Sequence, residues 1–86
     1  MALHVDFLSD TKKVYSGATT KVSLPTDNGM LEILPRHVDF VVNLAPGKVV
    51  IYNNGKSVSR TIVGKGVSYK QNEIVTILGQ EVEPLK

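Results

Sequence analysis

The residues best suited to chemistry occur in two copies of the sequence His-Val-Asp-Phe, at positions 4–7 and 37–40. Alternate side chains of a β-strand point to the same face, so each His and Asp would share a face. Two imidazoles and two carboxylates are enough ligands for a metal ion. However, the residues flanking the two copies differ, and nothing in the sequence places the copies together. We therefore interpret His4 and Asp6 as solvent-facing residues of a first strand.

Other patterns of catalytic or cofactor-binding residues lack support. Serines accompany the His and Asp residues, but no G-x-S-x-G motif is present to favour a Ser-His-Asp triad. No stretch matches the G-x-G-x-x-G or G-x-x-x-x-G-K-[ST] loops that hold phosphates. The chain has no cysteine, which excludes disulfides and thiolate chemistry and removes the usual sulfur ligands of zinc. The residues thus predict no catalytic set, no metal site and no cofactor.

The charge of the chain gives little indication of a partner. Ten Lys and Arg residues are scattered along the sequence, and the net charge is only +2. A β-barrel that binds single-stranded nucleic acid needs a basic groove with aromatic side chains on one sheet face. The five aromatic residues instead fall on separate predicted strands: Phe7, Tyr15, Phe40, Tyr52 and Tyr69. Such a barrel remains the alternative to a domain that binds another protein through an uncovered apolar face.

The elements that must position these residues are strands. Of the 86 residues, 24 are Val, Ile or Thr and only 3 are Ala, and branching at Cβ favours strands over helices. Short alternating runs lie between turn sequences spaced about 8–12 residues apart, which predicts nine or ten strands in a sandwich or barrel. The expected runs are 3–7, 14–17, 19–24, 30–34, 40–44, 48–52, 56–63, 67–70 and 74–78.

Three turn sequences make specific predictions. Asn54-Gly55 between two runs predicts a β-hairpin, because both residues tolerate positive φ. Pro46-Gly47 is typical of a type II turn. The sequence Gly64-Lys65-Gly66 predicts a bend where the chain changes sheet.

The chain is long enough for one domain. Its apolar runs are far shorter than the ~18 residues needed to span a bilayer, and its first residues do not form a secretory signal. We therefore expect a soluble domain whose membrane association passes through a partner.

Several blocks of sequence carry a resemblance to a known family. The chain has Leu3-His4-Val5 followed by Ser9, then Ser16-Gly17, and later a block from Gly29 through Pro35 to His37. A Pro-Gly-Lys turn follows at 46–48, and the last block, 64–78, ends in Val-Thr-Ile-Leu. Order and spacing hold from residue 3 to about residue 82. In this pattern the chain resembles the N-terminal domain of the epsilon subunit of the F-type ATP synthase.

The resemblance implies an all-β fold, a ten-stranded β-sandwich of two mostly antiparallel sheets over residues 1–80 with a short polar tail at 81–86. The family's domain binds the gamma subunit along its side, while its lower loops sit on the membrane c-ring. It performs no chemistry, uses no cofactor and binds no nucleic acid, and it reaches the catalytic alpha/beta head only indirectly. The implied role is a rotor subunit, peripheral on the cytoplasmic side of the bacterial inner membrane. The family's C-terminal helical hairpin is missing, which implies coupling without inhibition or ATP binding.

The resemblance also assigns residues. The gamma-facing positions are Ser9, His37 and Val42, and the loop that faces the c-ring is Asp27, Asn28, Gly29 and Met30. Met30 replaces an acidic residue of the family, although Glu32 supplies a carboxylate nearby. Arg36 replaces a glycine, so the resemblance does not determine the backbone conformation near His37. His37 itself is either an interface residue or a loop histidine bonded to neighbouring backbone.

Overall fold

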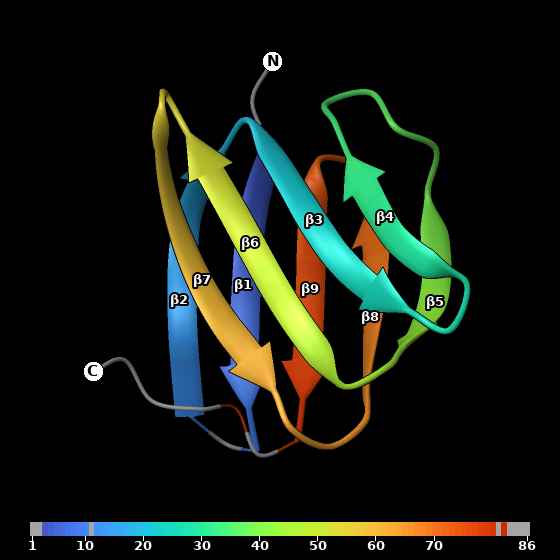
Figure 1. Cartoon of the computed structure of the whole chain (residues 1–86). Coiled ribbons are helices and arrows are strands. Elements are labelled where there is room, and N and C mark those ends of the chain that lie inside the picture. The colour runs from blue at the N-terminus through green and yellow to red at the C-terminus, as the bar shows by residue number, and fades with distance from the viewer. Residues whose placement is uncertain (1–2, 11, 81, 83–86) are drawn as a thin grey trace.

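The computed structural model describes residues 3–10, 12–80 and 82, which form two β-sheets packed face to face (Figure 1). The strands in chain order are β1 (Leu3–Ser9), β2 (Lys12–Thr19), β3 (Lys21–Thr26), β4 (Gly29–Ile33), β5 (Phe40–Leu44), β6 (Gly47–Asn53), β7 (Lys56–Ile62), β8 (Gly66–Gln71) and β9 (Ile74–Gly79). The predicted β-sandwich is confirmed.

The strand order is β2-β1-β9-β8-β5 in the five-stranded sheet and β4-β3-β6-β7 in the four-stranded sheet. Neighbouring strands are antiparallel except β1 and β9, which run parallel. The described residues therefore form nine strands, one fewer than the ten expected from the resemblance. Beyond β9, the described residue Val82 forms a single antiparallel bridge to Ile62. The rest of the expected tail, residues 81 and 83–86, lies outside the described residues.

The hydrophobic core lies between the two sheets and follows the alternation seen in the sequence. Leu3, Val5 and Phe7 point inward from β1, while His4 points to solvent. Burial of alternate residues is the pattern of a strand with one covered face. The other buried hydrophobic residues among those described are Val22, Leu24, Ile33, Leu44, Val49, Ile51, Ile62, Val75 and Ile77.

Two of the three predicted turns are confirmed. Asn54 and Gly55 connect β6 to β7 with φ of 52° and 82°, as a two-residue hairpin turn of type I′ requires. The segment 63–65 carries the chain from the four-stranded to the five-stranded sheet. The type II turn at Pro46-Gly47 is wrong, because Gly47 has a φ of 159° and already begins β6. This segment crosses between the sheets instead of folding back on itself.

Strand β8 buries its polar side chains. Val67 and Tyr69 alternate with Ser68 and Lys70, and it is Ser68 and Lys70 that point into the sandwich. The Ser68 hydroxyl donates to the carbonyl oxygen of Thr76 at 2.9 Å. The apolar side chains of β8 are consequently left on the outer face of the five-stranded sheet.

The connections gather at two ends of the sandwich (Figure 1). At the lower end of that view lie the turn 27–28, the crossings 45–46 and 63–65, and the end of β1. At the upper end lie the turns 54–55 and 72–73 and the connection 34–39 between β4 and β5. Among the described residues there is no helix long and apolar enough to cross a membrane.

Candidate protein-binding surface

The three positions assigned to a partner on the side of the domain belong to the five-stranded sheet or lead into it. Ser9 ends β1 at the lower end, Val42 lies in the middle of β5, and His37 precedes β5 at the upper end. Ser9 lies apart from the other two. The strands β9 and β8 lie between β1 and β5, which separates β1 from β5 by roughly 15 Å at about 4.8 Å per strand. One partner that touches all three must therefore extend across this sheet.

Val42 faces the core, not solvent. It is half-buried and packs against the buried cluster, since β5 directs Phe40, Val42 and Leu44 inward. Its neighbour Val41 is 77% exposed on the outer face. A partner that lies on this sheet thus meets β5 through Val41.

The outer face of the five-stranded sheet carries a group of apolar side chains, which we call the apolar face: Val41, Val67, Tyr69, Ile74 and Leu78. The strand pairing sets Val41 beside Tyr69 and Val67 beside Leu78. This patch combines β-branched and aromatic residues, which pack well on a pleated surface. Contiguous exposed apolar side chains of this kind mark surfaces that bind other proteins. Sequence reasoning missed the patch because the direction of β8 depends on its partners in space.

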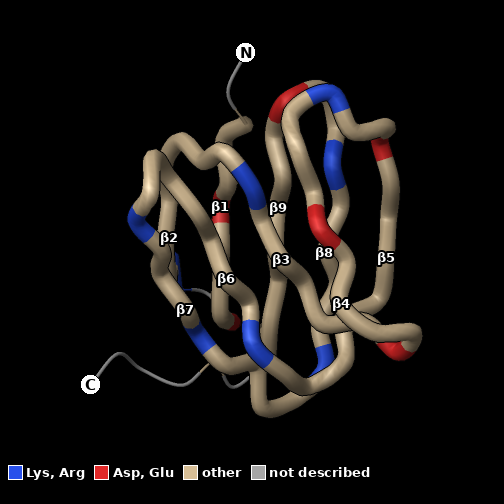
Figure 2. The backbone as a smooth tube through the Cα atoms, turned by 45° about the horizontal axis from the view of Figure 1, so that its top comes forward, with Lys and Arg blue, Asp and Glu red and all other residues tan. Residues whose placement is uncertain are grey.

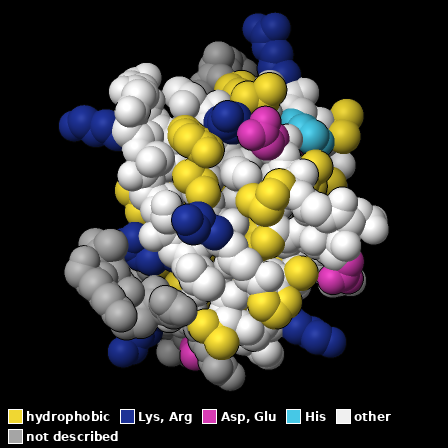
Figure 3. Space-filling view, viewed as in Figure 1, with side chains coloured by type: hydrophobic (Ala, Val, Ile, Leu, Met, Phe, Trp, Pro, Cys, Tyr) yellow, Lys and Arg dark blue, Asp and Glu magenta, His cyan; other side chains and the backbone are white. Residues whose placement is uncertain are grey.

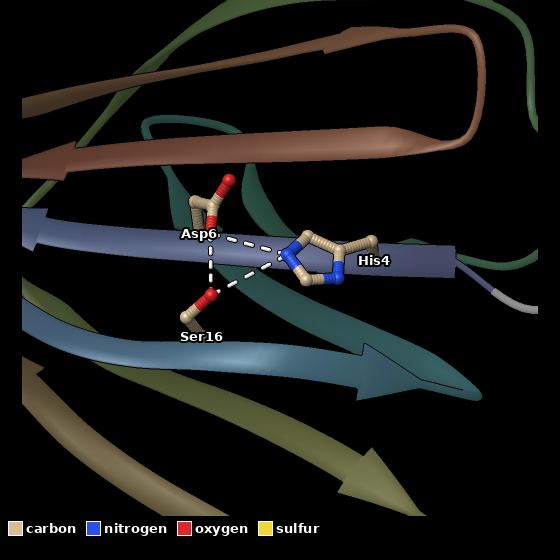
Figure 4. A network of polar contacts seen from close by, with 3 residues as sticks. All are labelled: His4, Asp6 and Ser16. Carbon is tan, nitrogen blue, oxygen red and sulfur yellow. Dashed lines mark hydrogen bonds and ion pairs between the residues drawn. The ribbon is translucent and has the colours of Figure 1, made fainter.

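Polar residues occupy the same face at β1 and β2. The Ser16 hydroxyl donates to Asp6 Oδ1 at 2.7 Å, and His4 Nε2 lies 3.2 Å from the same oxygen and 3.4 Å from Ser16 Oγ (Figure 4). In a catalytic triad, Ser and Asp contact opposite nitrogens of the imidazole. Here both contact Nε2, and the hydroxyl proton points to the carboxylate. This arrangement has the geometry of a surface hydrogen-bond network.

The network makes the stability of the domain depend on pH. The hydrogen bond from Ser16 lowers the pKa of Asp6 below its ordinary value of 3.8, outweighing the opposing effect of burial, and His4 adds to the lowering. The ionised carboxylate therefore stabilises the fold above pH 3.8, and this contribution disappears as pH falls through the lower folded-state pKa.

We expect Asp6→Asn to reduce the free energy of unfolding at pH 7 by less than about 1 kcal/mol, the range of exposed ion pairs. The difference from the wild type should shrink as the pH falls through the lowered pKa of Asp6, because the wild-type carboxyl then becomes neutral as well. Urea unfolding across this range measures it, with Asp10→Asn as the control. A difference that stays constant with pH would contradict the role of the carboxylate.

The predicted ring-facing loop is a tight turn at the lower end. Asp27 and Asn28 connect β3 to β4, and the Thr26 hydroxyl donates to the carbonyl oxygen of Gly29 at 2.6 Å. Met30 is exposed on the outer face of β4. The turn shares a hollow with the crossing 44–46 and with Lys65. Glu32, the neighbouring carboxylate, is paired with Lys21 at 3.5 Å.

His37 lies in a connection with an unusual backbone. Arg36 has a φ of 69°, a left-handed conformation that favours glycine. The backbone N–H of His37 donates to the carbonyl oxygen of Leu34 at 3.1 Å. Its ring stands edge-on to Phe40, with 5.7 Å between the centroids. The backbone near His37 thus keeps a conformation suited to glycine although Arg36 supplies a side chain.

Among the described residues, Lys side chains and aromatic rings are distributed over both faces of the sandwich. Tyr52 lies on the outer face of the four-stranded sheet, with Lys21 Nζ 4.5 Å from its ring centroid, whereas Tyr69 lies on the opposite side of the sandwich. The outer face of the four-stranded sheet mixes apolar side chains with Lys and Arg (Figure 3). The described residues contain no cluster of three or more potential metal ligands, and the two His-Val-Asp-Phe copies lie apart on β1 and before β5.

Comparison with known proteins decides the family. The model of the family described as ATP synthase, Delta/Epsilon chain, beta-sandwich domain matches residues 2–85. The chain belongs to this family. This ATP synthase delta/epsilon-type domain is 36% identical over 80 residues to the ATP synthase epsilon chain of Thioalkalivibrio sulfidiphilus, covering 91% of this chain and 56% of that protein. It is 37% identical over 81 residues to the epsilon chain of Halalkalibacterium halodurans, covering 94% and 60%.

Solved structures support the fold of this delta/epsilon-type domain. A chain in the mitochondrial ATP synthase of Euglena gracilis superposes with a TM-score of 0.87 at 21% identity, covering 96% of this chain and 53% of that chain. A chain in the central stalk and c-ring structure from Tetrahymena thermophila gives 0.78 at 14% identity, with coverages of 98% and 67%. The domain spans somewhat more than half the length of the curated relatives that it matches.

Proposed function

We propose that this domain is a non-catalytic part of the central stalk of a proton-translocating F-type ATP synthase. It binds the gamma subunit along its side and the c-ring at its lower end, so that rotation of the ring drives ATP synthesis. It catalyses no reaction itself and acts on the alpha/beta head only through gamma. It is held at the cytoplasmic side of a bacterial inner membrane by this complex, as a peripheral protein. Family membership supports the assembly, and the relatives named epsilon chain are bacterial.

The observation that carries the gamma contact is the apolar face of the five-stranded sheet. Ser9 and His37 flank this sheet at its two ends, and Val41 stands on its edge strand beside Val42. An extended partner on the apolar face would contact all of these elements at once. A rotor subunit needs such a contact, because it must turn with gamma as one body.

Reconstitution tests this function. An ATP synthase depleted of its epsilon subunit is incubated with the purified chain in membrane vesicles, and retention and ATP-driven proton pumping are measured. We expect the chain to stay bound to the enzyme and to increase the protons pumped per ATP hydrolysed. A chain that remains in the supernatant would contradict the proposal.

The lower end should contact the c-ring through the 27–30 loop. We therefore expect Met30→Cys to form a disulfide under oxidation with a cysteine placed in the polar loop of the c subunit. Met30 is exposed, so the substitution leaves the core unchanged. The control is Asn54→Cys in the turn at the opposite end (Figure 1). Equal cross-linking from both positions, or from Asn54 alone, would rule out this orientation.

Binding of single-stranded nucleic acid is the alternative that the composition left open. The separation of Tyr52 and Tyr69 on opposite faces of the sandwich provides no row of rings on which bases could stack. The side chains that make up the apolar face are uncharged, so they offer no ion pair to a phosphate backbone. These observations favour a protein partner.

A further inference from the structure

Lys70 is a buried cation at an inward-facing strand position, where the core of a β-sandwich usually has an apolar residue. Its side chain is 2% exposed, and it projects inward from β8 beside Phe40 of β5. Burying a charged amine is costly unless the charge is paired. Lys70 Nζ donates to Asp39 Oδ1 at 3.2 Å and lies 3.9 Å from Glu73 Oε1. These two carboxylates thus offset the cost of burying the Lys70 ammonium group.

The two carboxylates belong to different connections at the upper end of the sandwich. Asp39 ends the connection 34–39, which crosses from the four-stranded to the five-stranded sheet. Glu73 lies in the turn between β8 and β9, and its carbonyl oxygen accepts a hydrogen bond from the backbone N–H of His4 at 2.8 Å. Figure 2 shows residues of both charges gathered at this end. Lys70 therefore ties the crossing connection to a turn that is itself fixed to β1.

The connection 34–39 requires stabilising contacts because its backbone is strained at Arg36. Arg36 keeps a φ of 69°, which a residue with a side chain adopts only at a cost. Strained conformations persist where the surrounding structure leaves the chain no alternative. Phe40 supports the connection from one side through its edge-on contact with His37, and the ion pair with Lys70 fixes Asp39. His37 lies between these two restraints and the strained residue.

We propose that Lys70 is a positioning residue that holds the connection 34–39 in the conformation presenting His37 to the gamma subunit. The part of this inference that concerns gamma rests on the proposed function. Asp39 and Lys70 also line one hollow with Val41 and Tyr69 of the apolar face. The end of the connection therefore borders the surface on which gamma would lie.

The first test measures backbone motion without any partner. In the wild type, 15N relaxation should give residues 36–39 order parameters near the ~0.85 of rigid backbone, and Lys70→Met should lower them below about 0.6. Lys70→Arg, which keeps the charge, should retain most of the order. Ser68→Ala is the matched control, since Ser68 is also polar and inward-facing on β8 but bonds only to Thr76 among the described residues. Unchanged order in Lys70→Met would overturn the inference.

Asp39→Asn provides a second variant in case Lys70→Met fails to fold. Asp39 is 59% exposed on its side chain, so its substitution does not disturb the core. It should loosen the same residues while the order of β1 and β9 stays unchanged. If both variants leave the connection rigid, Lys70 does not position it.

The second test adds the gamma subunit. Lys70→Met and Asp39→Asn should each weaken gamma binding about tenfold, because only a fraction of molecules then presents the competent conformation. Lys70→Arg should restore most of the affinity. Looser backbone with unchanged gamma affinity would overturn the link between this connection and gamma. If the wild-type domain does not bind gamma at all, the proposed function fails, whereas the order parameters still decide whether Lys70 positions the connection.

Discussion

Val41→Asp is expected to weaken binding of the gamma subunit about a hundredfold while the domain remains folded. Val41 is 77% exposed on the edge strand of the five-stranded sheet, so a carboxylate there stays hydrated in the free domain. In the proposed complex this position lies within the apolar face and becomes desolvated. An unpaired charge buried in this way is strongly unfavourable.

The matched control is Val63→Asp. Val63 is also an exposed valine, but it lies in the crossing 63–65 between β7 and β8 and is not part of the apolar face. Calorimetric titration with gamma should give wild-type affinity for this variant, and both variants should keep their melting temperatures. Equal affinities for Val41→Asp and the wild type would mean that gamma does not lie on this face.

The second large effect concerns folding. Gly66→Ala is expected to destabilise the domain by about 2–3 kcal/mol, which lowers the melting temperature by roughly 10 °C or more. Gly66 pairs with Gly79 across β8 and β9, and a Cβ on Gly66 would lie 2.5 Å from the carbonyl oxygen of Leu78. Relief of that contact requires movement of backbone, since the neighbouring Gly79 Cα is only 3.3 Å away.

A second glycine separates this contact from the general effect of adding a methyl group. Gly17 also lies within a strand of the five-stranded sheet, and the atoms nearest to its Cβ would belong to the Tyr15 side chain, the closest at 3.4 Å, which is ordinary van der Waals contact. Gly17→Ala should therefore change stability little, or raise it slightly by restricting the unfolded chain. Thermal unfolding of the two variants gives the comparison. Equal losses would contradict the steric explanation for Gly66.

Local sequence predicted those features that depend on a few neighbouring residues. Asn54-Gly55 defines its own turn because both residues accept positive φ, and the alternation of Leu3, Val5 and Phe7 defines which side of β1 is buried. The bend at 64–66 was likewise predicted from its own residues, Gly64-Lys65-Gly66. The β-branched composition was sufficient to indicate an all-β fold.

Features that depend on distant partners were not predictable in this way. Lys70 and Ser68 point inward because Asp39 and the Thr76 carbonyl oxygen are there to receive them, and no local pattern shows those partners. The apolar face follows from this reversal, so it was also missed. Pro46-Gly47 resembles a turn, but the chain is crossing between sheets at that point. Val42 was assigned to a gamma-facing surface, whereas the pairing of β5 directs its side chain to the core.

The central claim is that this domain binds gamma through the five-stranded sheet. Calorimetric titration of the purified chain with the gamma subunit from the same source tests it most directly, with a single-stranded oligonucleotide titrated in parallel. The account predicts a saturable one-to-one complex with gamma, loss of affinity in Val41→Asp, and no heat of binding with the oligonucleotide. A folded chain that does not bind gamma but binds the oligonucleotide would contradict this account.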